Sequence, residues 1–290
     1  MLGKLFLYDM KNQLRIWRFA YIGILGFSLL TALIRCLDFK KGVLGEIWGA
    51  VYGVSKGFFY AAGAVMIFAT LFYAVLYFRN NLLKDQGYLM HTLPVKESEL
   101  FLSKFLSSWC CILLSILVFA AGIVITRFGT GDLFSIIYTE NGVAKRISLS
   151  MLFFGEGYET PRLLFLVIFF AIPVNLSLFL FSLTLGYTMK QSKRRMNRDV
   201  LSVLVYIGTY AGQQFLGVIS LILGALLYFR HYGTKSFMEQ ILSEQGPTAQ
   251  LPMDYFITVA VGIDGILIIG LAVAAVFWSI YRLKKYLNLE

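Results

Sequence analysis

Charge, histidine and cysteine are all scarce in this chain. Only 14% of its 290 residues are Asp, Glu, Lys or Arg, whereas soluble domains carry about 25% charged residues. The three cysteines, Cys36, Cys110 and Cys111, are odd in number and lack Cys-x-x-Cys spacing, so we expect neither a disulfide framework nor a cysteine-based metal site. The two histidines, His91 and His231, have no partners in the pattern of a catalytic triad.

Apolar residues are in excess and make up 58% of the chain. A helix needs about 20 consecutive apolar residues to cross a bilayer, and unbroken runs of this length exclude the alternating pattern of a membrane β-barrel. The sequence therefore predicts an all-α integral membrane protein with six transmembrane helices, near Phe19–Cys36, Phe58–Phe78, Phe105–Thr126, Leu163–Tyr187, Val200–Phe229 and Tyr255–Tyr281.

The basic residues are concentrated on one side of this predicted topology. If both termini share a side, the segments 1–18, 79–104, 188–199 and 282–290 hold most of the 26 Lys and Arg and few of the 16 acids. The positive-inside rule assigns such segments, and hence both termini, to the cytoplasm. We therefore interpret the net charge of +10 as a topological signal and a contact with anionic lipid headgroups rather than as a nucleic-acid site.

The helical pattern divides the chain further. Lys4, Lys11, Arg15 and Arg18 would share one face of a helix, which predicts an interfacial amphipathic helix over residues 1–18. Residues 19–281 are expected to form one six-helix membrane domain, and residues 282–290 a cytoplasmic tail. Asp38–Gly57 is predicted to be an outer loop, with an amphipathic stretch over Val43–Tyr52 at the outer interface.

The polar segment 79–104 carries several signals of a chain reversal. The second helix is expected to continue through Lys84, Gly87 permits a break, and Pro94 favours the start of a new element. Glu97 and Glu99 suit the first turn of that element, because acids stabilise the positive end of a helix. The reversal is expected to expose five apolar side chains, Leu82, Leu83, Tyr88, Leu89 and Leu93.

At this reversal the chain resembles the permease subunits of ABC-2 type transporters. In that family the loop between the second and third helices often reads as an acidic-Glu-Gly-Tyr group, then Thr-Leu-Pro-Val, then a Ser-Lys pair. Two positions depart from this pattern, Gln86 and Lys96. The matching residues here are Asp85, Gly87, Tyr88, Thr92, Leu93, Pro94, Val95, Ser103 and Lys104.

The resemblance implies that this loop docks on a separate ATP-binding cassette subunit in a bacterial cytoplasmic membrane. No GxxxxGK[ST] phosphate loop occurs in the chain, so ATP and magnesium would bind to that partner, and this chain would be neither an enzyme nor a cofactor carrier. A second permease chain, identical or homologous, and membrane lipid are the other expected partners. The coupling residues would be Asp85, Gly87, Tyr88, Leu89, Leu93 and Pro94.

Polar residues within the apolar runs are candidates for a substrate path. Asp264, Gln213, Gln214 and Asn175 lie at membrane depth, and an acid there costs about 2.5–3.5 kcal/mol on insertion scales. Asp264 either lines that path or packs against another helix, and Pro173 predicts a kink. Two other function classes stay open: a non-transporting scaffold, sensor or immunity protein with this fold, and a membrane-embedded enzyme, for which no cluster of ionisable groups is evident.

Overall fold

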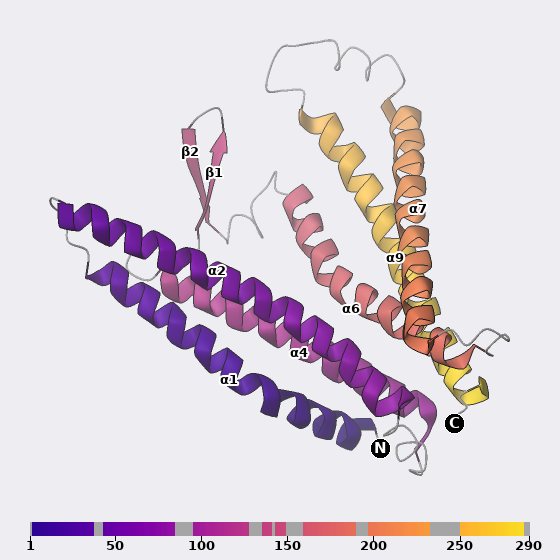
Figure 1. Ribbon diagram of the computed structural model, residues 1–290. Helices are drawn as coiled ribbons and strands as arrows, with labels where there is room; N and C mark the ends of the chain where they lie inside the picture. Colours follow the sequence, from indigo (N-terminus) through magenta and orange to yellow (C-terminus); the bar gives the residue numbers. More distant parts are fainter. Residues whose placement is uncertain are drawn as a thin grey trace. The chain divides into compact units, whose positions relative to one another are not determined.

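The computed structural model describes residues 2–37, 43–84, 95–127, 135–140, 143–148, 159–189, 197–232 and 250–286. Within these ranges the chain forms long helices and one β-hairpin (Figure 1). The elements are α1 (Leu2–Cys36), α2 (Val43–Phe78), the π-helix η1 (Arg79–Leu83), α4 (Glu97–Thr126), β1 (Ser135–Glu140), β2 (Val143–Ser148), α6 (Glu159–Thr188), α7 (Arg198–Tyr232) and α9 (Gln250–Tyr286).

In the part of the chain that the structure describes, six helices are long and apolar enough to cross a membrane. This confirms the predicted number of membrane helices and identifies a multi-pass membrane protein. The cytoplasmic placement of the termini and the interfacial placement of residues 1–18 stay predictions. The antiparallel hairpin of β1 and β2, in which Ile136 pairs with Ile147, was not predicted from the sequence.

Contacts within the chain divide it into two compact units. Unit 1 covers residues 1–149 and contains α1, α2, η1, α4 and the hairpin; unit 2 covers residues 150–288 and contains α6, α7 and α9. Each unit therefore has three of the six membrane-spanning helices. The single membrane domain expected over residues 19–281 consists of these two parts.

Helices α1, α2 and α4 lie side by side in unit 1 (Figure 1). Their apolar core is formed by Tyr21, Ile24, Phe59 and Met66, all buried. Phe59 stacks on Phe119 of α4, with ring centroids 5.5 Å apart. A tightly packed helix interface of this kind depends on dispersion contacts, since lipid tails are as apolar as the side chains themselves.

Two helix boundaries in unit 1 differ from those expected. α1 is one continuous helix, so residues 1–18 are its first turns rather than a separate element. α2 begins at Val43, and the stretch Val43–Tyr52, predicted to belong to an outer loop, is therefore its N-terminal part. Two hydrogen bonds join this N-terminal part of α2 to α1. Trp48 Nε1 donates to the Ile34 carbonyl at 2.7 Å, and Arg35 Nη1 donates to the Tyr52 hydroxyl at 3.3 Å.

Unit 2 is a three-helix arrangement in which α6 contacts both α7 and α9. Val174, Leu178 and Ala275 form its buried core between α6 and α9. Small residues permit close approach: a Cβ on Gly186 of α6 would overlap Ser202 of α7, and a Cβ on Gly224 of α7 would lie 2.9 Å from the Ala260 Cβ of α9. Pro173 lies inside α6, where its missing N–H interrupts the helical hydrogen bonding.

Candidate functional site

The proposed coupling residues, Asp85, Gly87, Tyr88, Leu89, Leu93 and Pro94, lie outside the described residues, which end at Lys84 and resume at Val95. The two helix ends that border this segment are described. The second helix continues to the π-turn that ends at Leu83, and α4 begins with Glu97 and Glu99 in its first turn, as predicted.

The end of the second helix is a π-helix rather than a regular α-helix. The Lys84 N–H donates to the Arg79 carbonyl at 3.1 Å, which closes a wider i to i+5 turn. π-turns of this kind are frequent at functional sites. The expectation that Leu82 and Leu83 are exposed was wrong, because both are buried where the end of α2 packs against the start of α4 through Phe78 and Phe101.

A buried ion pair lies within the same end of unit 1. The Asp9 carboxylate of α1 accepts a hydrogen bond from Lys104 Nζ of α4 at 3.1 Å, and each side chain is only 1% exposed. Tyr77 of α2 donates its hydroxyl to the same Asp9 oxygen at 2.8 Å, and Ser103 donates to the other carboxylate oxygen at 2.9 Å. Asp9 therefore connects three helices.

The surroundings of this pair offset the cost of removing two charges from water. Burying an ion pair is favourable only when the geometry is good and further hydrogen bonds satisfy the remaining polar groups. Asp9 meets this condition, because both of its oxygens accept hydrogen bonds. Lys104 Nζ lies in addition 5.2 Å from the centre of the Tyr77 ring, within the range of a cation–π interaction.

Two further polar contacts follow the ion pair along α1 and α4. Gln13 is buried and donates its amide to Ser107 Oγ at 3.1 Å. Tyr21 forms a hydrogen bond of 2.9 Å with Ser115, and Ser115 in turn lies 3.0 Å from the Thr70 hydroxyl of α2. We call the set Asp9, Gln13, Tyr21, Tyr77, Ser103, Lys104, Ser107 and Ser115 the polar seam.

Sequence reasoning did not identify the polar seam. Asp9 was counted only among the acids of the basic segments. Lys104 was counted as a cytoplasmic basic residue and, with Ser103, as part of the motif that resembles ABC-2 permeases, but not as the partner of Asp9. A signal was present, however, because Asp9 and Gln13 are one helical turn apart, as are Ser103 and Ser107. Residues spaced by four share a helix face, so a short polar row on each of the two helices is compatible with a polar contact between them.

The intramembrane polar residues of unit 2 do not converge on one point. Asp264 is half-buried, and its carboxylate accepts a hydrogen bond from Ser220 Oγ of α7 at 3.5 Å. Asn175 donates its amide to the Ala171 carbonyl of its own helix at 2.8 Å. Gln214 is exposed. The geometry of Asp264 corresponds to the helix-packing alternative, and the substrate path through these residues stays a prediction.

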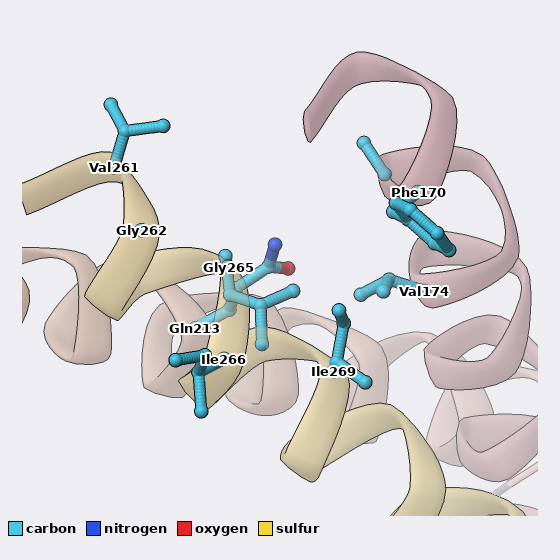
Figure 2. A pocket seen from close by; sticks show the side chains of 10 residues that line it. Phe170, Val174, Gln213, Val261, Gly262, Gly265, Ile266 and Ile269 are labelled. Carbon is cyan, nitrogen blue, oxygen red and sulfur yellow. The ribbon is translucent and has the colours of Figure 1, made fainter. Parts of the chain in front are cut away.

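Gln213, another member of this predicted path, lines a cavity. The cavity lies between α6, α7 and α9 and has a volume of about 200 Å³. Figure 2 shows the Gln213 amide directed into the space between α9 and Phe170 and Val174 of α6. Asp264 is not among the lining residues, although Gly262 and Gly265 on either side of it are.

Comparison of the chain with protein-family models, curated proteins and solved structures gives no match. Within the described ranges, no group of three or more His, Cys, Asp or Glu residues is placed to hold a metal ion. The chemical character of the two candidate regions therefore comes from their own residues. One is the buried charged cluster of Asp9, Tyr77, Ser103 and Lys104, and the other is an apolar cavity with a single amide.

Proposed function

We propose that this chain is the membrane-spanning permease subunit of an ABC-2 type, ATP-driven exporter in a bacterial cytoplasmic membrane. A separate ATP-binding cassette subunit would hold ATP and magnesium and dock on the reversal over residues 79–104. A second permease chain, identical or homologous, would complete the complex. The proposal is supported by the six membrane helices and by the residues with which segment 79–104 resembles that family.

The observation that carries this proposal is the position of Ser103 and Lys104. Both belong to the motif that the chain shares with the family, and both bond Asp9 in the interior of unit 1. Force applied to the start of α4 would therefore act on α1 as well. An ATP-driven change in structure requires that ATP bind the two states with different affinity, and the partner subunit supplies that difference.

The polar seam and the π-turn give this motion a physical route. ATP binding brings two partner subunits together and displaces the 85–94 segment, to which η1 and α4 are directly joined. Because Asp9 is bonded from α2 and α4, helices α1, α2 and α4 then move as one body. In this proposal the membrane helices then rock between inward-open and outward-open arrangements, which gives the substrate alternating access to the two sides of the membrane.

Co-purification tests this proposal. The tagged chain is solubilised from the membranes of its own cells in a mild detergent and isolated through the tag. We expect an ATP-binding cassette protein to be retained and to hydrolyse ATP in the isolated complex. Retention of no ATPase, under conditions in which the chain itself stays folded and dispersed, would contradict the proposal.

A further inference from the structure

One side of α1 packs within unit 1, and the opposite side is exposed. The packed side carries Asp9, Gln13 and Tyr21, each of which bonds α4. Residues three or four apart lie on one face of a helix, and a face on the other side of α1 carries exposed side chains from its first turn to its last. These are Lys4, Lys11, Arg15, Arg18, Ile22, Leu29 and Leu33.

This exposed face changes from basic to apolar between Arg18 and Ile22. Each side chain of the basic part carries a full positive charge, whereas Ile22, Leu29 and Leu33 beyond it are 67%, 54% and 57% exposed and carry none. The face therefore has one end suited to an anion and one end suited to hydrocarbon. We define the α1 stripe as the six residues Lys11, Arg15, Arg18, Ile22, Leu29 and Leu33.

The basic half of the stripe is free of carboxylates in the part of unit 1 that the structure describes. Asp9 is the only acid of α1, and its carboxylate is buried against Lys104. Within the described ranges, no acid forms an ion pair with Lys11, Arg15 or Arg18. An added anion would therefore meet three cations that no neighbouring carboxylate neutralises.

The change from cations to apolar side chains occurs at the depth expected for the edge of a bilayer. The hydrocarbon of a bilayer is about 30 Å thick, which corresponds to about 20 residues of helix at a rise of about 1.5 Å each. Counted back from Cys36, where α1 ends, this length reaches Trp17, and tryptophan is common at membrane interfaces. Arg18 then lies at the hydrocarbon boundary, and Arg15 and Lys11 lie in the headgroup layer.

The dimensions of the stripe correspond to those of a phospholipid. Lys11 and Arg18 are about 10 Å apart along the helix axis, and a planar guanidinium binds phosphate oxygens in pairs. The Arg18 guanidinium lies 4.8 Å from the centre of the Phe19 ring, a cation–π contact that orients it. From Ile22 to Leu33 the apolar half extends about 16 Å, close to the hydrocarbon thickness of one leaflet.

We propose that the α1 stripe binds an anionic phospholipid, with phosphate at Lys11, Arg15 and Arg18 and an acyl chain along the apolar half. A lipid with two phosphates should bind more tightly than one with a single phosphate, because three cations are available. A zwitterionic lipid brings its own cation and should bind weakly. Such binding requires no ATPase, so the inference goes beyond the proposed function and can hold or fail independently of it.

Native mass spectrometry of the full chain in detergent tests the inference. The probes are cardiolipin, phosphatidylglycerol and phosphatidylcholine with the same acyl chains, which carry two phosphates, one phosphate, and one phosphate beside a cation. Glycerol 3-phosphate supplies the phosphate without the chains. We expect saturable retention of cardiolipin, weaker retention of phosphatidylglycerol, no saturable retention of phosphatidylcholine, and no displacement of cardiolipin by an equal concentration of glycerol 3-phosphate.

Paired substitutions show whether the stripe is the site. Arg15→Gln with Arg18→Gln should weaken cardiolipin binding about 30-fold, because each cation near an anionic membrane surface strengthens the attraction about fivefold. The control, Lys96→Gln with Lys284→Gln, removes two exposed cations from other helices and should leave the affinity unchanged.

A second variant covers the case in which the loss of two cations disturbs membrane insertion. Arg15→Lys with Arg18→Lys retains the charge and the topological signal but removes the paired hydrogen bonds of the guanidinium groups. It should weaken cardiolipin binding about 2- to 12-fold.

Four results would overturn the inference. Equal losses in the two glutamine pairs would mean that net charge alone attracts the lipid. Retention of phosphatidylcholine as strong as that of cardiolipin would show that the stripe does not select anionic lipid. Displacement of cardiolipin by glycerol 3-phosphate would show that the apolar half contributes nothing. Absence of any saturable lipid would show that another part of the protein or a second chain covers the stripe.

Discussion

Asp9 and Lys104 are 95 residues apart in sequence, yet their side chains meet at 3.1 Å in the interior of unit 1. The pair joins the first turns of α1 to the first turns of α4. Because α4 follows the segment proposed to bind an ATPase, the ion pair is one of the contacts through which α1 would follow a movement of that segment.

Lys104→Met is expected to destabilise the protein strongly. The methionine nearly preserves the side-chain length but leaves the Asp9 carboxylate buried without its cation, and such losses cost about 3–5 kcal/mol. The measurement is the thermal unfolding of the purified chain in detergent, followed by circular dichroism. A large fall in the unfolding temperature is expected, together with a lower yield of folded protein.

The matched control for this substitution is Lys96→Met, since Lys96 is exposed at the start of the same helix. Its unfolding temperature should be close to that of the unaltered chain. The double variant Asp9→Leu, Lys104→Met should recover much of the lost stability, because no unpaired charge remains. A double variant less stable than Lys104→Met would contradict this account of the pair.

Tyr21→Phe tests the contact at the other end of the polar seam. The change removes the hydroxyl that bonds Ser115 and the Cys111 carbonyl. Each buried hydrogen bond lost typically costs about 0.5–1.5 kcal/mol. Denaturation of the chain by urea or detergent should show this decrease. Tyr8→Phe, at a side chain that is 64% exposed, should change stability much less. Equal effects of the two substitutions would argue against a stabilising role of the seam.

The helix ends near the reversal could be predicted from the sequence because their signals are local. Pro94, Glu97 and Glu99 mark the start of a helix through backbone geometry and the helix dipole, and α4 does begin at Glu97. The start of α2 at Val43 could not be predicted in this way. Its first turns are stabilised by Trp48 and Tyr52 bonding α1, and such tertiary contacts leave no trace in local composition.

Gly186→Ala is expected to disrupt the packing of α6 on α7. A Cβ at this position would lie 2.8 Å from the Ser202 backbone nitrogen and Cα, so the helices would have to separate, at a cost of about 1–3 kcal/mol. Gly208→Ala in α7 is the control, because a Cβ there meets nothing within 4 Å. That change should leave stability unchanged or raise it by about 0.5–1 kcal/mol. Thermal unfolding distinguishes the two outcomes.

Asp264→Asn is expected to leave both the yield of folded protein and ATP-driven transport unchanged. An asparagine oxygen can still accept the hydrogen bond from Ser220, and Asp264 lies outside the lining of the cavity. The measurement compares the two chains in vesicles, at equal protein content. A loss of transport by a chain that still folds normally would contradict this expectation and would indicate that Asp264 lines the substrate path.

The candidate functional residues also differ in whether local sequence or long-range contacts reveal them. Gln213 was identifiable because an amide in an apolar run is conspicuous by itself. The pairing of Asp9 with Lys104 was not identifiable, because each residue lies in a segment whose charge is already explained by membrane topology. Only the three-dimensional structure shows that the two neutralise one another, and that Tyr77 and Ser103 complete the cluster.

In the proposed function, the segment over residues 79–104 transmits the movement of a partner ATPase to the membrane helices. The most direct test measures ATP-driven transport by the complex after reconstitution in lipid vesicles. The variant is Leu93→Ala. The control is Leu117→Ala, which alters an exposed apolar side chain of α4. We predict that Leu93→Ala weakens ATPase binding and lowers transport severalfold, while Leu117→Ala has little effect. Full ATPase binding and transport in the Leu93→Ala chain would contradict the claim.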